Sequence, residues 1–462
     1  MIFDRSAAYE ETRQRHQSYF LGLLPEYLTR LQWSRDQIEA EQTRALRELV
    51  RHAANYSPWH QGRLGHLDID RLTPAALGDI PPMTKDDLME QWDAIVTDPR
   101  CTLAAAEAHL ATLVADAYFL GDLHVIASGG SSGKRGVFVY DWHGWAVSAL
   151  GLTRGLVSIL LQAGPAAPGP FATVSAYVAS HATSALSQTF SDPARPTVRA
   201  PVTLPLAEIV EILNRAQPSV LQSYASMLPA LCAEVRDGRL RIQPRLVWSS
   251  SEPLLPEVRT LAEATWGVPV LNNWAASESP GGAFCCPIDP GCHISEDVNI
   301  IEPVDGRGNA VPRGERSAKI LLTNLYNRIM PLIRYEITDE FELAATPCSC
   351  GSAYVKVADV HGRADDVFTY AAGVKVHPLN FRTVLGKDPA IVEYQVRQTA
   401  DGAAVDAVAT PGLDIAAIRA ALEERLATLG LGAPRVIVRR VRAIRREATG
   451  KLKRFVSLPQ AG

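Results

Sequence analysis

The chain lacks a dominant charge. Its 46 Lys and Arg residues are nearly balanced by 50 Asp and Glu residues, which leaves a formal net charge of -4. A nucleic-acid-binding protein normally shows a strong basic excess or a basic stripe, so no nucleic-acid partner is expected. No run of like charge suggests an interaction tail either.

Long apolar runs are also scarce. The first residues, MIFDRSAAYEETRQRH, have no apolar core behind a basic stretch, so a signal peptide is not expected. No apolar stretch is expected to reach the ~18 residues that a membrane span requires. We therefore expect a cytoplasmic protein without a membrane partner.

The 462 residues, 47% of them hydrophobic, suffice for one large domain and a smaller one. Ser34 and Thr84 are expected to cap helices over 34–56 and 85–92. Between about 124 and 300, helical and strand-like segments alternate, which favours an α/β domain with a largely parallel sheet. The pattern then changes twice, to short strands with glycine turns over 296–340 and to mixed strands and helix after Gly362. We predict an N-terminal domain over 1–362 that contains a β subdomain at 296–340, and a small α+β domain over 363–462.

The first chemical signal is a glycine- and serine-rich loop between two β-rich runs. Glycines let the backbone approach an anion, successive N–H groups can bind phosphate oxygens, and hydroxyls and a lysine add donors. The spacing is not that of a Walker A motif, because Arg135 follows the lysine. On its own the loop is equally well a surface loop; its residues are Ser128, Gly129, Gly130, Ser131, Ser132, Gly133 and Lys134.

Six segments in order resemble the motifs of the phenylacetate–CoA ligase branch of the adenylate-forming (acyl-activating) enzymes. They are the loop 128–134, the sequence SSEP at 250–253, WAASE at 274–278, PLIRYEITD at 331–339, HGRADD at 361–366 and GKLKR at 450–454. The segments RALRELVRHAANYSPWHQGRL and DIPPMTKDDL near the N-terminus also resemble this branch, so the likeness spans nearly the whole chain. The departures include Gly129 for serine, Arg135 for proline, Trp274 for tyrosine and Ala275 for glycine.

The resemblance implies the adenylate-forming fold, in which the C-terminal domain is mobile, and it implies roles for individual residues. The loop would hold the β- and γ-phosphates of ATP, Glu278 would hold Mg²⁺, and Asp339 would accept hydrogen bonds from the ribose, with Arg363 as an added donor. Lys451 would reach the α-phosphate and the substrate carboxylate, and Asp365 would be the hinge. The remaining expected nucleotide contacts are Ser251, Glu252, Pro253, Asn273, Trp274 and Ser277.

The implied reaction is ATP-dependent activation of an aromatic carboxylic acid to its acyl-adenylate, followed by thioester formation with coenzyme A. Flat aromatic walls suit a flat ring. The candidate acid contacts, each equally well a core residue, are Tyr140, Trp145, Tyr177, His181 and Ala276. Two alternatives stay open: an enzyme of the same fold that passes the acyl group to a carrier-protein thiol or an amine, and a catalytically silent zinc-stabilised scaffold. A homodimer is a further expectation.

Five of the seven cysteines lie in two short stretches, which in a reducing compartment favours a metal over disulfides. Three cysteines and one histidine form a regular structural zinc set. The branch has a similar Cys…Gly-Leu-His-Ile and Cys-x-Cys-Gly pairing, and alignment on His293 selects Cys286, Cys348 and Cys350. Cys285 and Cys292 remain alternatives to Cys286, and a group of buried free thiols is the alternative to a metal.

Overall fold

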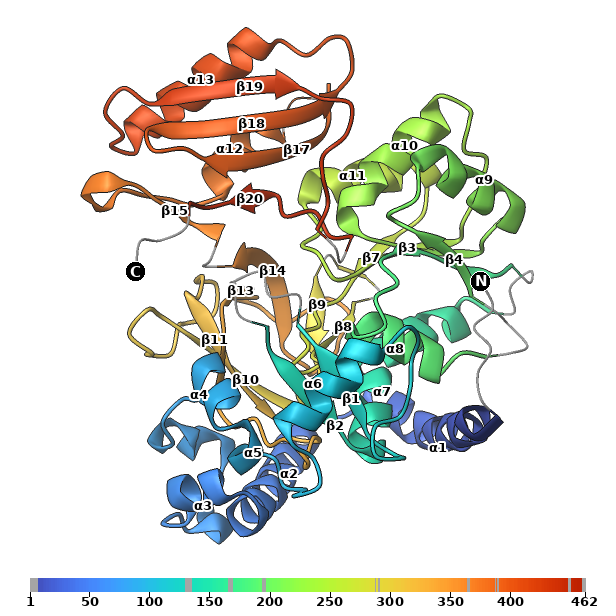
Figure 1. Cartoon of the computed structure of the whole chain (residues 1–462), viewed down its shortest axis with the longest axis vertical. Helices are drawn as coiled ribbons and strands as arrows, with labels where there is room; N and C mark the ends of the chain where they lie inside the picture. The colour runs from blue at the N-terminus through green and yellow to red at the C-terminus, as the bar shows by residue number, and fades with distance from the viewer. Residues whose placement is uncertain are drawn as a thin grey trace. The chain divides into compact units, whose positions relative to one another are not determined.

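The computed structural model describes residues 7–128, 135–164, 169–192, 197–286, 288–289, 291–363, 366–386, 388, 390–447 and 450–458. They form two compact units (Figure 1). Unit 1 comprises 1–167, 177–196 and 271–360, and unit 2 comprises 168–176, 197–270 and 361–462. The break at 360/361 lies two residues from the predicted domain boundary. Residues 168–176 and 197–270, however, group with the C-terminal segment, so the division at 362/363 stays a prediction.

The N-terminal half of unit 1 is mostly helical. Both predicted caps are confirmed, because Ser34 and Thr84 each form a capping box with the residue three positions on. The helices and 3₁₀ turns are α1 (Ala7–Arg30), α2 (Arg35–Tyr56), α3 (Pro58–Leu64), η1 (Ile69–Arg71), η2 (Pro74–Asp79), α4 (Lys85–Glu90), α5 (Trp92–Ile95), α6 (Leu103–Thr112), α7 (Trp142–Gln162) and α8 (Ala182–Thr189).

Three small sheets complete unit 1. The hairpin of β1 (His124–Ala127) and β2 (Val137–Tyr140) pairs Ala127 with Val137, so the predicted strand–loop–strand arrangement around the glycine–serine loop is confirmed. An antiparallel sheet in the order β10-β11-β12 lies where the β subdomain is predicted; its strands are β10 (Asn299–Val304), β11 (Lys319–Asn324) and β12 (Tyr335–Ile337). A four-stranded sheet in the order β13-β14-β9-β8 is made of β8 (Ala283–Cys285), β9 (Cys292–Ile294), β13 (Asp339–Leu343) and β14 (Lys356–Arg363).

Helix α7 corrects one sequence expectation. By length and composition it could span a membrane, although no apolar stretch of that length is expected from the sequence. Two thirds of its most apolar window, 67%, is buried inside the protein. Its Arg154 is fully buried and donates two hydrogen bonds to the carboxylate of Asp297, at 2.6 and 2.7 Å. A buried core helix accounts for these features.

The first part of unit 2 contains the predicted parallel α/β arrangement. The five-stranded sheet has the order β4-β3-β5-β6-β7, and the pairs β3/β4, β3/β5 and β5/β6 are parallel. Helices connect successive strands, as parallel pairing requires. The elements are β3 (Phe171–Ser175), β4 (Val198–Pro201), α9 (Leu206–Ala216), β5 (Val220–Ser223), η3 (Ala225–Met227), α10 (Leu228–Arg236), β6 (Leu246–Ser249), α11 (Pro256–Trp266) and β7 (Val270–Asn272).

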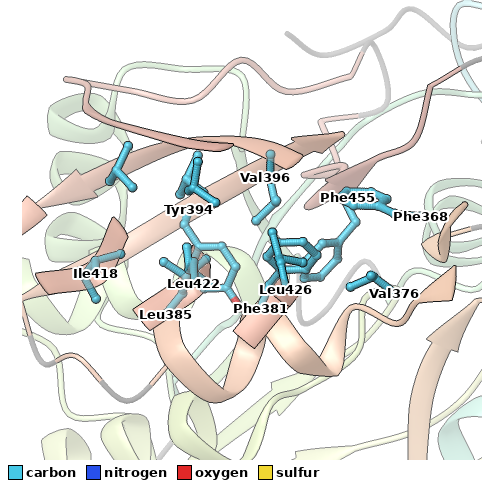
Figure 2. Packing of buried hydrophobic residues seen from close by; sticks show 14 of the residues in the cluster. Phe368, Val376, Phe381, Leu385, Tyr394, Val396, Ile418, Leu422, Leu426 and Phe455 are labelled. Carbon is cyan, nitrogen blue, oxygen red and sulfur yellow. The ribbon is translucent and has the colours of Figure 1, made fainter. Parts of the chain in front are cut away.

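The C-terminal segment has its own sheet and core, as predicted for a small α+β domain. The sheet order is β19-β18-β17-β20, and α12 and α13 supply apolar side chains to the same core. Figure 2 shows Phe368, Phe381 and Phe455 gathered at one end of this core. The elements are β15 (Phe368–Thr369), η5 (Ala371–Gly373), β16 (Lys375–Val376), α12 (Leu379–Leu385), β17 (Ile391–Gln398), β18 (Gly402–Ala409), α13 (Ile415–Thr428), β19 (Arg435–Arg440) and β20 (Phe455–Val456).

Candidate active site and candidate metal centre

In unit 1, two predicted nucleotide-binding residues from distant motifs meet directly. The indole Nε1 of Trp274 donates a buried hydrogen bond of 2.7 Å to Oδ2 of Asp339. Trp274 lies just after β7, and Asp339 begins β13. Both side chains are buried, at 6% and 7% exposure. The ring of Trp274 also meets Phe341 edge-on, with centroids 5.0 Å apart.

Glu278 lies at the end of the same motif, half-buried. Its backbone oxygen accepts a hydrogen bond of 2.9 Å from Asn324 Nδ2. Burial and then the nearby Glu278 carboxylate raise the pKa of the Tyr335 phenol well above its usual value. This half-buried carboxylate in a turn between strands has the hard oxygen ligands that Mg²⁺ prefers.

The base of the glycine–serine loop is defined by its two flanking residues. Ser128 donates its N–H to Gly136 O at 2.9 Å, and Ser128 Oγ accepts the N–H of Gly136 at 2.8 Å. Lys85 Nζ lies 3.4 Å from the same Oγ. The predicted phosphate contacts between them lie outside the described residues: Gly129, Gly130, Ser131, Ser132, Gly133 and Lys134.

Lys85 is a residue that the sequence motifs do not single out. Its position is fixed locally, because Thr84 and Asp87 form the capping box of α4 and Met83 bridges to Tyr335 of β12. The ammonium therefore reaches the loop base from an anchored turn. A signal is present in the sequence, since Lys85 lies in the segment DIPPMTKDDL that resembles the ligase branch.

In unit 2, the structure joins two further motifs that are 200 residues apart. Glu252 Oε1 accepts the N–H of Leu452 at 3.0 Å, and Glu252 Oε2 accepts the N–H of Ser226 at 2.9 Å. Lys451, the expected catalytic lysine, precedes Leu452 directly. Ser251 adopts a positive φ of 70°, a costly conformation for a serine that is common at functional sites. The GKLKR motif thus lies against the SSEP motif, of which Pro253 is exposed.

The remaining predicted residues differ in how far the structure describes them. Tyr140 and Trp145 are fully buried; Tyr140 donates to Ser277 O at 2.7 Å and Trp145 Nε1 to Thr189 Oγ1 at 3.0 Å. These contacts favour the core-packing alternative, and their contact with an acid stays a prediction. Tyr177, His181 and Ala276 are half-buried, and Asn273 is buried. Asp365 and the side chain of Arg363 lie outside the described residues.

The predicted metal ligands converge. One ligand atom from each of Cys286, His293, Cys348 and Cys350 lies within 4.8 Å of the other three. The Sγ atoms of Cys286 and Cys348 are 3.5 Å apart, and Cys350 Sγ lies 3.3 Å from His293 Nε2. A tetrahedral zinc with Zn–S bonds of about 2.3 Å needs spacings near these. His293 Nδ1 is bonded to Tyr354 O at 2.9 Å, which leaves Nε2 for a metal.

Strand geometry explains why Cys285 and Cys292 are not in this group. They face each other in the β8/β9 register, one position away from the pair formed by Phe284 and His293. Because successive side chains alternate between sheet faces, Cys285 and Cys292 lie on the face opposite to His293. The choice of Cys286 over both cysteines therefore agrees with the geometry of the described residues.

Comparison with solved structures identifies the fold of this chain. The structure of 2-hydroxyisobutyryl-CoA ligase in its postadenylation state, bound to R3-HIB-AMP, superposes with a TM-score of 0.68 at 18% identity, over 94% of this chain and 91% of that one. The structure of 2-hydroxyisobutyryl-CoA ligase in its thioesterification state superposes with a TM-score of 0.58, over 93% of this chain and 91% of that one. The chain has the fold of the adenylate-forming enzymes, as its motifs predicted.

Among curated proteins, the chain is 26% identical over 375 residues to a phenylacetate-coenzyme A ligase of Thermus thermophilus, 78% of each chain. It is also 25% identical over 161 residues to the protein CapK of Staphylococcus aureus, 34% of each. No protein-family model matches. The resemblance to the phenylacetate–CoA ligase branch is confirmed by the first of these relatives.

Proposed function

We propose that this protein is an AMP-forming acid–thiol ligase, which activates a carboxylic acid with ATP and passes the acyl group to coenzyme A. The observation that carries the proposal is the contact of the GKLKR and SSEP motifs at Glu252 in unit 2. This contact brings two motifs that are 200 residues apart in the chain to one position, where a single ligand can meet both. The Trp274–Asp339 pair in unit 1 and the 2-hydroxyisobutyryl-CoA ligase fold support the same function.

In this proposal each of the described site residues has a separate role in adenylation. Two anions, a carboxylate and a phosphate chain, must meet, so the site has to supply positive charge and fixed donors. Lys451 orients the carboxylate and the α-phosphate, Asp339 binds the ribose and Glu278 holds Mg²⁺. Mg²⁺ neutralises charge on the phosphates when it is bound. Segment 128–134 and Arg363 supply further phosphate and ribose donors.

The metal group is proposed to hold a structural zinc. Three thiols and one imidazole form a closed set without an open position for substrate, which is typical of structural rather than catalytic zinc. The ligands come from the β8–β9 hairpin and from the loop between β13 and β14, so a metal would tie both parts of one sheet together.

The substrate class is proposed to be an aromatic carboxylic acid, such as a benzoate, an aminobenzoate or a phenylacetate. The support is the curated relative, which is a phenylacetate-coenzyme A ligase. Half-buried Tyr177 and His181, just after β3, are the described aromatic side chains that remain candidates for contact with the acid. A homodimer and a location in the cytoplasm stay predictions.

A pyrophosphate-exchange panel of aryl acids against medium-chain fatty acids tests the proposal. We expect exchange with at least one aryl acid, and product formation that depends on coenzyme A. Lys451→Ala should lower exchange by at least about 10²-fold, the scale of one lost electrostatic donor, and should leave attack of coenzyme A on preformed adenylate largely intact.

Other outcomes select the alternatives. Preference for octanoate over every aryl acid would refute the substrate class. Exchange without any dependence of product formation on coenzyme A would identify a carrier-protein or amine acceptor. Absence of exchange with every acid, by a protein that binds no ATP, would identify the silent scaffold.

A further inference from the structure

One departure from the ligase motifs, Trp274, creates a hydrogen bond inside unit 1. Tryptophan stands at 274 where tyrosine is usual, and its N–H reaches the carboxylate of Asp339 at 2.7 Å. A tyrosine ring carries its only donor at the far end of the ring and has no N–H at its edge. This contact therefore exists because the residue is tryptophan.

The residues around Trp274 restrict its indole ring to one orientation. Its backbone oxygen accepts the N–H of Ala283 at 3.0 Å. A Cβ on Gly282 would lie 2.2 Å from the indole Cζ3, so only glycine leaves room for the ring. Phe341 packs against the ring edge-on at 89°. Backbone, glycine and aromatic neighbour together fix the direction of the indole N–H.

The carboxylate and the aromatic neighbour come from the same strand. Asp339 and Phe341 are two positions apart on β13, so they lie on one face of it. The indole spans both: its N–H meets the carboxylate and its ring meets the phenyl group. A hydrogen bond to a charged acceptor is shorter and stronger than a neutral one. One oxygen of Asp339 is thereby held in a defined direction.

We propose that Trp274 is a positioning residue that orients the Asp339 carboxylate to receive the ribose hydroxyls of the nucleotide, with Gly282 as the residue that makes room for it. This inference rests on the proposed function, because it assigns Asp339 to a ribose. It adds that the strength of ribose recognition depends on the indole N–H and not only on an aromatic surface.

The test measures binding of AMP, 2′-deoxy-AMP and 3′-deoxy-AMP by calorimetry, so it needs no carboxylic acid. Wild type should prefer AMP over both deoxynucleotides. Trp274→Phe keeps an aromatic ring and removes the N–H, and should reduce this preference by about tenfold, which corresponds to about 1.4 kcal/mol. In the Asp339→Asn background the same change should have no further effect on the preference, because the charged acceptor is absent.

Trp266→Phe is the matched control. Trp266 is also buried, at 3% exposure, on α11, and its Nε1 has no hydrogen-bond partner among the described residues. This variant loses indole packing alone and should keep the wild-type preference. If Trp274→Phe does not fold, Gly282→Ala serves instead, because it displaces the ring while keeping the indole; it should lower the preference in the same way.

The results separate the inference from the proposed function. An unchanged AMP preference in folded Trp274→Phe overturns the positioning role, and so does a wild type that binds AMP without any ribose preference. A wild type that binds neither AMP nor ATP overturns the proposed function itself. Rescue of the preference by Trp274→His, which restores a ring N–H, would support the inference further.

Discussion

At the scale of single residues, Lys85 lies outside the six motif segments and yet reaches the base of the glycine–serine loop. Its Nζ lies 3.4 Å from Ser128 Oγ, and among the described residues no carboxylate pairs with it. A half-buried ammonium beside an expected phosphate loop would compensate the charge of the nucleotide.

We predict that Lys85→Met raises the KM for ATP in pyrophosphate exchange by about tenfold, because one charge-assisted contact to phosphate is lost. The KM for the acid should change little. Lys375→Met, at an exposed position on β16, is the control and should leave both values unchanged. Equal changes in the two KM values for Lys85→Met would argue against a phosphate contact.

How much of the site was predictable also differs from residue to residue. The convergence of the four predicted ligands was predictable, because two short cysteine clusters with a histidine match the ligand pattern of a structural zinc site, and the four side chains do come together; that they hold a metal stays a prediction. The bond between Trp274 and Asp339 was not, because it depends on strand register and on the space left by Gly282. Trp145 is a third case, because an aromatic residue in this region has the same sequence pattern whether it packs in the core or contacts substrate. It is fully buried, which favours core packing, and its contact with an acid stays a prediction.

At the scale of secondary-structure elements, the metal group joins the β8–β9 hairpin to the loop that precedes β14. Cys348→Ser removes one thiolate, and we predict a lower melting temperature together with loss of zinc, because metal binding to a structural site contributes folding free energy. The intrinsic rate of the folded fraction should fall much less. Elemental analysis after dialysis should find one zinc per chain in wild type; a metal-free protein of full stability would contradict a structural zinc. Cys101→Ser, at a buried cysteine outside the group, is the control.

Helix α1 is held against the rest of unit 1 by a buried neutral histidine, His16. His16 bonds Trp142 O at 2.8 Å and Tyr118 Oη at 3.1 Å, and it stacks on the Trp142 ring. Burial, with repulsion from His124 adding to it, lowers the pKa of His16 from 6.5 to about 3. The folded protein therefore keeps this ring neutral across the range where the unfolded chain takes up a proton.

The sign of the pH effect follows from this lowered pKa. Above about pH 6.5 His16 is neutral in both the folded and the unfolded chain, so it does not lower the free energy of unfolding. As the pH falls from about 6.5 toward 3, only the unfolded chain protonates His16, and the free energy of unfolding therefore decreases progressively. We predict that His16→Gln removes about 1.4 kcal/mol of the decrease in unfolding free energy between pH 7.5 and 5.5. Urea unfolding of both proteins at the two pH values measures it. The same decrease in both proteins would show that His16 is not the group responsible.

At the scale of the whole molecule, the order of elements was predictable and the grouping was not. Alternating helices and strands predicted the parallel sheet that runs from β3 to β7, because each parallel pair needs a crossover connection. The division of 168–176 and 197–270 into a unit with the C-terminal segment depends on tertiary contacts that have no local sequence pattern. The sequence also did not reveal that helix α7 is long and apolar enough to span a membrane. Its apolar residues are buried around most of the helix, and Arg154 interrupts the apolar run in the sequence.

The resemblance to the ligase branch implies that the domain after residue 362 is mobile and that Asp365 is its hinge, and this leads to one prediction at the scale of the whole molecule. A proline fixes φ, so Asp365→Pro should block the dihedral change of a hinge while leaving each domain folded. Pyrophosphate exchange should stay within about twofold of wild type, and thioester formation should fall by about tenfold or more. Asp365→Ala keeps the backbone free and should support both half-reactions. Equal loss of both half-reactions in the proline variant would argue against a hinge.

The spacing of two sulfur atoms at the metal group has a consequence for redox chemistry. Cys286 and Cys348 are 62 positions apart in the chain, and their Sγ atoms lie only 3.5 Å from each other. A bound zinc would protect these thiolates, whereas a chain without metal would hold two thiols ready to oxidise to a disulfide. Such a disulfide would close the same loop in place of the metal, and two of the four proposed ligands would no longer be available to zinc. Purification in air, without a reductant, would let dissolved oxygen accept the two electrons and give a protein that takes up zinc only after reduction, so the metal content and melting temperature that test the structural zinc have to be measured on reduced protein.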